Sequence, residues 1–155
     1  DGRFGAKTTE AVRRYQKRSG LAVDGSASND GSNLLEELRV AYLLHRLHSS
    51  EKAPSGYDVL KIATRGSARL LGRSDIGSLA AGKCCDLFLI DSRRMELVGA
   101  CYDPKSVLAT VGVRGPVDYT VVNGKITVRE GRLACIDEEK TARDAQAKCT
   151  EYLAK

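Results

Sequence analysis

The chain has 155 residues, of which 42% are hydrophobic and 29% charged. This is the composition of one globular domain, and it excludes a disordered or fibrous protein. No apolar run approaches the about 20 residues of a transmembrane helix, so we expect no membrane partner. The net charge of +5 is spread along a chain without Trp. Because the sequence has neither a basic stripe nor a set of stacking aromatic residues, we expect no nucleic-acid partner either.

The five cysteines are odd in number and irregularly spaced. This pattern fits neither a CxxC metal site nor a disulfide framework. Free thiols persist in reducing compartments, so the sequence predicts a cytoplasmic protein with buried free cysteines. The residues concerned are Cys84, Cys85, Cys101, Cys135 and Cys149.

The first half of the chain predicts three helices. A short one lies within residues 1–19 and ends at Gly20. After a polar Gly/Ser/Asn-rich loop at residues 24–33, apolar residues at spacings of three and four predict an amphipathic helix to about His48. Ser32 or Asn33 would cap it. A third helix is predicted over residues 57–72, closed by a glycine.

The second half predicts strands. Residues 85–91 form a continuous apolar run that favours a strand. Residues 117–122 and 125–130 flank Asn123-Gly124, the pair typical of a type I′ hairpin turn. Residues 132–136 predict another strand, and residues 138–153 a charged helix with Ala142, Ala145, Cys149 and Leu153 on its apolar side. The fold class predicted is α+β, with N-terminal helices, a small antiparallel sheet and a C-terminal helix.

From about residue 20 onward the chain resembles the C-terminal part of a metal-dependent amidohydrolase, of the 8-oxoguanine deaminase, guanine deaminase and chlorohydrolase branch. Four stretches in the family's order carry this resemblance: "VDGSASNDGSN", "LLEELRVAYLLHRL", "ATRGSARLLGRSDIGSLAAGKCCDLFLID" and "VDYTVVNGKITVREGRL". It implies an incomplete TIM barrel over residues 20–72, followed over residues 73–155 by part of a β-sandwich and a tail helix.

The resemblance also implies a site. Asp24 matches the family's aspartate at the end of the eighth barrel strand, where it binds zinc or iron and accepts a proton from the attacking water. The same resemblance places Ser26, Ser28, Asn29 and Asp30 at the mouth of a pocket for a purine or triazine-like substrate.

The chain departs from the family in its histidines. No HxH pair is present, and the only histidines, His45 and His48, follow Asp24, whereas the family's metal histidines precede it. A catalytic zinc needs three or more protein ligands, so one carboxylate does not suffice. We expect the isolated chain to be inactive, and we expect the two histidines to be ordinary helix residues.

Residues 1–25 carry a second resemblance, to half of a small peptidoglycan-binding domain. The pattern "DGRFGAKTTEAVRRYQKRSGLAVDG" matches that domain's spacing, and it overlaps the amidohydrolase resemblance at "GLAVDG". An alternative is therefore a chimeric or engineered non-catalytic module with a peptidoglycan-binding-like segment at residues 1–19. The start at Asp1 rather than Met favours a fragment or an excised piece. Exposed sheet edges predict self-association in either case.

Overall fold

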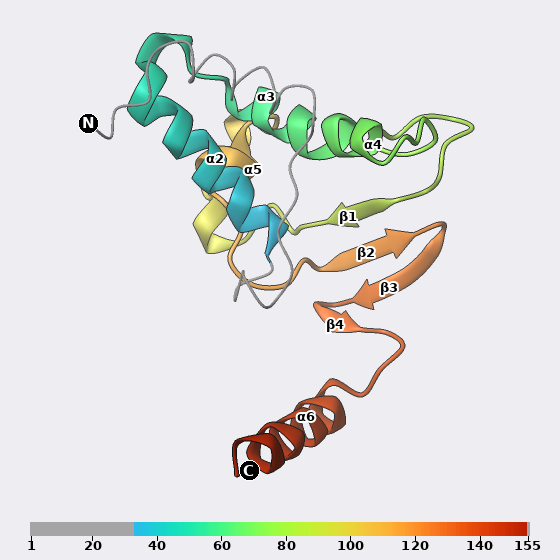
Figure 1. The fold of residues 1–155 in the computed structure, drawn as a ribbon. Coiled ribbons are helices and arrows are strands. Elements are labelled where there is room, and N and C mark those ends of the chain that lie inside the picture. Colours follow the sequence, from blue (N-terminus) through green and yellow to red (C-terminus); the bar gives the residue numbers. More distant parts are fainter. Residues whose placement is uncertain (1–32, 155) are drawn as a thin grey trace. The chain divides into compact units, whose positions relative to one another are not determined.

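The computed structural model describes residues 33–154 (Figure 1), and the predicted helix within residues 1–19 lies outside them. The chain divides into two compact units. The described part of the first comprises residues 33–83 and 92–114, and is mainly helical. The described part of the second comprises residues 84–91 and 115–154, and holds a sheet followed by a helix. The predicted order of helices, antiparallel sheet and C-terminal helix is confirmed.

The first helix described, α2, spans Leu34–Ser49, close to its predicted range. Asn33 caps it, because its side-chain Oδ1 accepts a hydrogen bond from the Leu35 N–H at 3.1 Å. The alternative cap, Ser32, lies outside the described residues. A short 3-10 turn, Ser50–Lys52, follows.

The predicted helix over residues 57–72 is present in three parts. It begins with α3 (Gly56–Lys61), continues through a π-helical segment (Ile62–Gly66) and ends with α4 (Ser67–Leu70). In the middle segment the Ser67 N–H reaches back five residues to the Ile62 carbonyl, which widens the turn. Gly72 follows with φ +67°, the left-handed conformation expected where a helix ends.

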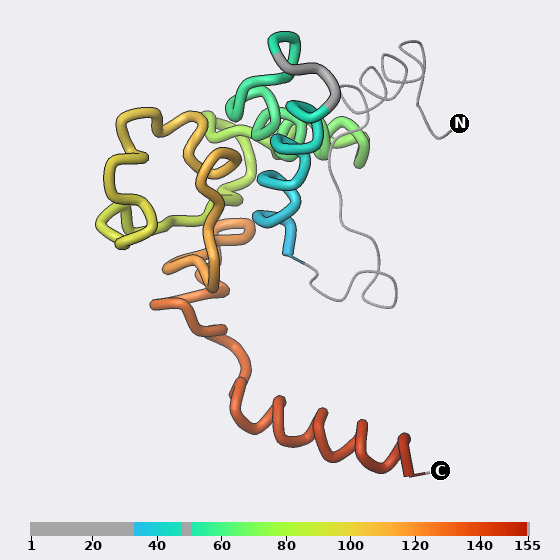
Figure 2. The backbone as a smooth tube through the Cα atoms, turned by 90° about the vertical axis from the view of Figure 1, so that its left-hand side faces the viewer, coloured from blue at the N-terminus to red at the C-terminus, as the bar shows by residue number. Residues whose placement is uncertain are grey.

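Residues 92–114 add helical turns that the sequence did not predict. Two 3-10 turns, Met95–Leu97 and Ala100–Tyr102, precede the short helix α5, Val107–Thr110. Figures 1 and 2 both show α5 beside α2, and α5 also contacts α3. Where these helices meet, Leu38, Val59 and Ala109 form a buried cluster.

The second unit holds a four-stranded antiparallel sheet in the order β1-β2-β3-β4. Its strands are Leu87–Leu89, Tyr119–Val122, Lys125–Arg129 and Arg132–Leu133, each shorter than predicted. Asn123 and Gly124 have φ of 49° and 76°, which confirms the type I′ turn between β2 and β3. The edges are the short strands β1 and β4, and self-association through them stays a prediction.

Side chains in the flanking loops add hydrogen bonds to this sheet. The Asn123 N–H donates to Asp86 Oδ1 at 2.7 Å, which ties the hairpin turn to the start of β1. The Asp91 N–H donates to Asp118 Oδ2, also at 2.7 Å, and joins the loop after β1 to the loop before β2. Hydrogen bonds from loop carboxylates therefore support a sheet whose strands are only two to five residues long.

The last helix, α6, spans Glu138–Leu153 as predicted. The Lys140 N–H donates to Asp137 Oδ1 at 2.9 Å, so Asp137 is its N-cap. The apolar side expected for this helix is exposed in the described chain, with Leu153 82% exposed.

The prediction of buried cysteines is wrong, although all five are free thiols. Cys84 is half-buried and the other four are exposed. The reason is their position: Cys85 and Cys135 flank short strands, Cys101 lies in the 3-10 turn Ala100–Tyr102, and Cys149 lies on the exposed helix α6. Over residues 33–154, none of the helices combines the length and the apolar character needed to cross a membrane.

Candidate functional site

The site residues predicted from sequence all precede α2 in the chain. These residues lie outside the described part of the chain, so their roles stay predictions. They are Asp24, Ser26, Ser28, Asn29 and Asp30. The described residues begin just after this stretch, at Asn33, which caps α2.

Both histidines lie on α2. His45 is half-buried, and His48 is in the last turn of the same helix. Among the side chains that the structure describes, which do not include that of His48, no group of three or more His, Cys, Asp or Glu could hold a metal ion. These described side chains do not by themselves offer the donors that a zinc or iron site needs.

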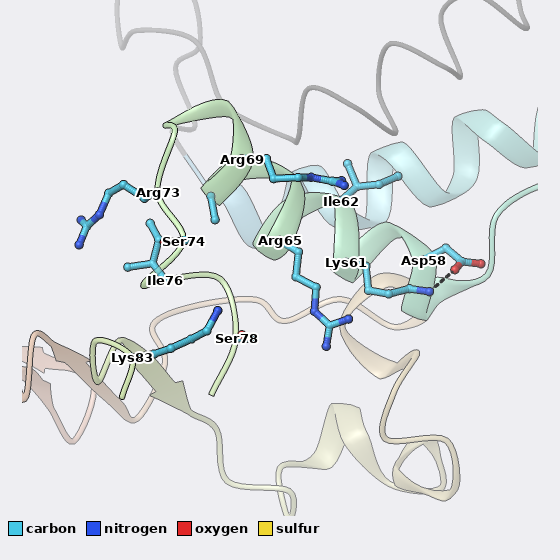
Figure 3. Close-up of a pocket in the computed structure, with 11 residues that line it drawn as sticks. Asp58, Lys61, Ile62, Arg65, Arg69, Arg73, Ser74, Ile76, Ser78 and Lys83 are labelled. Carbon is cyan, nitrogen blue, oxygen red and sulfur yellow. Dashed lines mark ion pairs between the residues drawn. The ribbon is translucent and has the colours of Figure 1, made fainter. Parts of the chain in front are cut away.

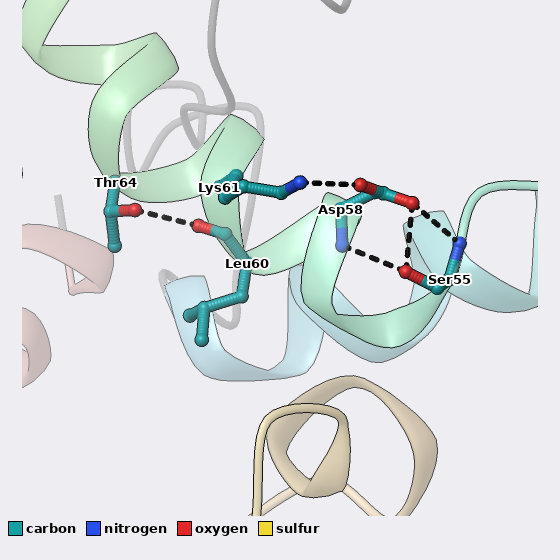
Figure 4. A network of polar contacts seen from close by, with 5 residues as sticks. All are labelled: Ser55, Asp58, Leu60, Lys61 and Thr64. Atoms are coloured by element: carbon teal, nitrogen blue, oxygen red, sulfur yellow. Dashed lines mark hydrogen bonds and ion pairs between the residues drawn. The ribbon is translucent and has the colours of Figure 1, made fainter.

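A polar network at the start of α3 positions one carboxylate (Figure 4). Ser55 is the N-cap: its Oγ accepts from the Asp58 N–H at 3.2 Å, while its own N–H donates to Asp58 Oδ2 at 3.1 Å. The Ser55 hydroxyl also donates to Asp58 Oδ2 at 2.7 Å. On its other side, Asp58 Oδ1 lies 2.7 Å from Lys61 Nζ. This is a capping box extended by an ion pair.

These contacts change the acidity of Asp58. The ammonium of Lys61, followed by the hydroxyl of Ser55, lowers the pKa of Asp58 to about 2, because both contacts favour the ionised carboxylate. Asp58 is therefore ionised throughout the physiological pH range, and its negative charge is paired with the positive charge of Lys61.

A cavity of about 660 Å³ lies beside this network (Figure 3). The helix from α3 to α4 forms one wall, and the loop after α4 with Lys83 forms the other. Its lining residues are Asp58, Lys61, Ile62, Arg65, Ala68, Arg69, Arg73, Ser74, Ile76, Ser78 and Lys83.

Glycine 77 lets the loop lie against the helix. A Cβ there would be 2.8 Å from Ala68 Cβ and 3.0 Å from the Thr64 carbonyl oxygen, and its φ is +83°. Only glycine combines this conformation with this close approach. The wall that carries Ile76 and Ser78 therefore depends on Gly77.

This cavity was not predicted from the sequence. The signal available was Lys61, Arg65 and Arg69, three cations four residues apart that share one helical face. The loop's contribution to the cavity could not be predicted from the spacing of residues along the sequence, because it depends on tertiary contacts between the loop and the helix.

Comparison with known proteins places the chain in a family. The profile of the Amidohydrolase family matches residues 5–127, which is most of the chain. The chain belongs to the amidohydrolase family. The match includes residues 5–25 of the stretch 1–25 that also resembles a peptidoglycan-binding domain.

Two curated amidohydrolase relatives illustrate the similarity. Hydroxydechloroatrazine ethylaminohydrolase from Pseudomonas sp. strain ADP is 47% identical over 146 residues, covering 91% of this chain and 30% of the relative. The 8-oxoguanine deaminase of Pseudomonas aeruginosa is 44% identical over 118 residues, covering 76% of this chain and 26% of the relative. The chain thus spans about a third or less of the length of these relatives.

Solved structures agree with this assignment. The zinc complex of atrazine chlorohydrolase from Arthrobacter aurescens TC1 has a TM-score of 0.75 and 38% identity, covering 83% of this chain and 29% of that one. An adenosine deaminase from Xanthomonas campestris with bound zinc has a TM-score of 0.78 and 25% identity, covering 94% of this chain and 33% of that one. The helices and small antiparallel sheet are consistent with a part of the amidohydrolase fold.

Proposed function

We propose that this chain is the C-terminal segment of a metal-dependent hydrolase that cleaves C–N bonds of purine or triazine-like rings. The observation that carries the proposal is the 47% identity to a triazine aminohydrolase over 91% of the chain. Under this proposal residues 20–72 form the end of the barrel, and residues 73–155 contribute part of the sandwich and the tail helix.

Asp24 is the residue proposed to bind the metal, with zinc or iron as the candidates. Bound at such a site, the metal would supply an activated water for hydrolysis. Because zinc needs at least three protein ligands and the two histidines of this chain follow Asp24 on α2, the remaining ligands must come from outside these 155 residues. Ser26, Ser28, Asn29 and Asp30 are proposed to line the substrate pocket.

A graft tests the role of Asp24. The chain replaces the matching C-terminal segment of the Pseudomonas sp. ethylaminohydrolase, and ethylamine release from that enzyme's substrate is measured. The active graft should lose nearly all activity with Asp24→Asn, while Asp144→Asn on the exposed helix α6 should leave it unchanged. Equal activity of the graft and its Asp24→Asn variant would refute the assignment.

The isolated chain provides the complementary test. Loaded with zinc or iron and incubated with guanine, 8-oxoguanine or hydroxydechloroatrazine, it should release neither ammonia nor ethylamine. Metal-dependent release would show that these 155 residues hold a complete site, contrary to the proposal.

The alternative, a non-catalytic module that recognises the cell wall, is favoured by the dense motif match in residues 1–25. A pull-down with purified peptidoglycan should then retain the full chain more strongly than a chain lacking residues 1–19. Equal retention, or none, would remove this alternative.

A further inference from the structure

The cavity between the α3–α4 helix and the loop after it has the size of a ligand site. Its volume of about 660 Å³ lies within the range of pockets that enclose one small molecule. A pocket of this volume suits a compact ligand better than a length of polymer.

Positive charge dominates the lining of this cavity (Figure 3). Five of its side chains are cationic: Lys61, Arg65, Arg69, Arg73 and Lys83. Asp58 is the one carboxylate among the described lining residues, and it is paired with Lys61. The cavity therefore has a surplus of positive charge after its internal ion pair is counted.

Two of these cations are available to a ligand. Arg73 is held by Asp75, with Nε and Nη2 at 2.9 and 2.6 Å from the two carboxylate oxygens. By contrast, neither Arg65 nor Lys83 has a side-chain ion-pair or hydrogen-bond partner within residues 33–154. Arg65 extends from the helix on the side where Lys83 lies (Figure 3), so the two charges flank one space from different elements.

The charge of Arg65 does not serve helix stability. Lys61 pairs with Asp58 at the start of the helix, whereas Arg65 has another cation four residues away on either side, Lys61 and Arg69, and neighbouring like charges repel. An anionic ligand would offset this repulsion, whereas the described chain offers Arg65 no carboxylate.

The cavity also has apolar lining residues. Ile62 lies on the helix, Ile76 on the loop, and the buried Ala68 lines the cavity where the loop approaches the helix at Gly77. The lining thus combines cations with apolar side chains that can contact the organic part of a ligand.

We propose that this cavity binds a phosphorylated small molecule of nucleotide size. Phosphate oxygens would accept hydrogen bonds from the Arg65 guanidinium, which matches phosphate geometry with two parallel donors, and from the Lys83 ammonium. The organic part of the ligand would contact Ile62 and Ile76. The proposal does not depend on the hydrolase proposal, because it involves none of residues 24–30.

Calorimetric titration of the full chain with ATP, ADP, pyrophosphate, adenosine and citrate tests the ligand class. ATP and ADP should bind, pyrophosphate should bind more weakly, and adenosine should not bind. Affinity should fall as salt rises, because the contacts are charged. Binding of citrate as strong as that of ATP, or of adenosine as strong as that of ATP, would overturn the phosphate assignment.

Charge reversals then locate the site. Arg65→Glu and Lys83→Glu should each weaken ATP binding about tenfold or more, as loss of a charge-assisted hydrogen bond predicts. The matched control Arg143→Glu makes the same charge change on the exposed helix α6 and should leave affinity unchanged. An equal loss in all three variants would mean that net charge alone attracts the nucleotide, and would overturn the site.

A second measurement keeps the test decisive if Arg65→Glu does not fold. In the unmodified chain, ATP should shift the amide NMR signals of residues 61–69 and 73–83 and leave those of α6 unchanged. Shifts confined to other residues would refute the proposal without any variant.

Discussion

The two units of this amidohydrolase chain differ in how they hold their shape. All six buried hydrophobic side chains of the described residues belong to the first unit: Leu38, Val59, Ala68, Leu97, Ala109 and Val113. Within residues 84–91 and 115–154, no residue is buried, and Phe88, Ile126 and Leu133 are each about 40% exposed. The first unit has a hydrophobic core and the second does not.

The second unit instead rests on local backbone geometry. Two glycine-containing turns with positive φ, at Asn123-Gly124 and Glu130-Gly131, connect its last three strands. Carboxylates of Asp86 and Asp118 accept backbone hydrogen bonds beside the strands. Substitutions of core side chains should therefore act strongly in the first unit, whereas turn and cap substitutions should have the larger effects in the second.

The largest expected effect is the loss of a core side chain. Leu38, 2% exposed, contacts the α3 and α5 residues of its cluster, and Leu38→Ala should destabilise the first unit by about 2–5 kcal/mol through lost burial and a cavity. Leu44→Ala on the same helix removes a side chain that is 51% exposed and should cost under about 0.5 kcal/mol. Hydrogen exchange of each unit measures both. Equal costs would deny that the core holds this unit together.

Two glycine substitutions separate the effect of close packing from the effect of backbone conformation. Gly77→Ala in the first unit combines a left-handed φ with a close approach to Ala68 and should cost about 2–3 kcal/mol. Gly124→Ala in the second unit meets nothing within 4 Å, so only its φ of +76° matters and the cost should be about 1 kcal/mol. Denaturant unfolding followed in each unit tests this order. A larger cost at Gly124 would contradict the role of close packing at Gly77.

Loss of a loop carboxylate should affect the second unit alone. Asp86→Ala removes the acceptor of the Asn123 N–H and should cost about 1 kcal/mol, seen as faster amide exchange at Asn123 and its neighbours. Exchange in α2 should not change, which serves as the internal control. An unchanged rate at the hairpin would show that this bond adds nothing.

The smallest expected effect is a pH dependence in the first unit. The folded pKa of Asp58, about 2, lies below its ordinary value of 3.8, so its contribution is complete above about pH 4 and is lost as the pH falls toward 2. The side chain is 44% exposed, and solvent screening keeps the contribution under about 1 kcal/mol. Acid unfolding of Asp58→Asn and unmodified chains should therefore converge near pH 2. A stability gap that widens below pH 4 would reverse this sign.

Much of the fold follows from local sequence signals. The Asn123-Gly124 turn, the ranges of α2 and α6 and the glycine after α4 were predictable, because turn chemistry, caps and helical periodicity act over a few residues. The helical turns within residues 92–114 were not. Short segments such as α5 have too few residues for a period, and their helical form depends on packing against α2.

The candidate sites show the same limit. The loop with Asp24 came from a family resemblance, and its geometry lies outside the described residues. The basic cavity came from the structure, because Lys83 joins Arg65 only after the loop turns back at Gly77. The exposure of the cysteines was mispredicted, since residue type alone does not determine whether another helix or sheet packs over the element that carries the cysteine.

The register shift between Thr120 and Val121 bears on what fixes the pairing register of β2 and β3. Val121 pairs with Ile126, but Thr120 pairs with Val128, so Thr127 is an extra residue on β3. Ile126 and Val128, two residues apart, therefore point to opposite faces, and both faces of the sheet carry apolar side chains. Sliding β3 by one residue would exchange one partly exposed apolar face for another, with little change in burial. The alignment of this hairpin is thus set by its two-residue turn and by the position of the extra threonine.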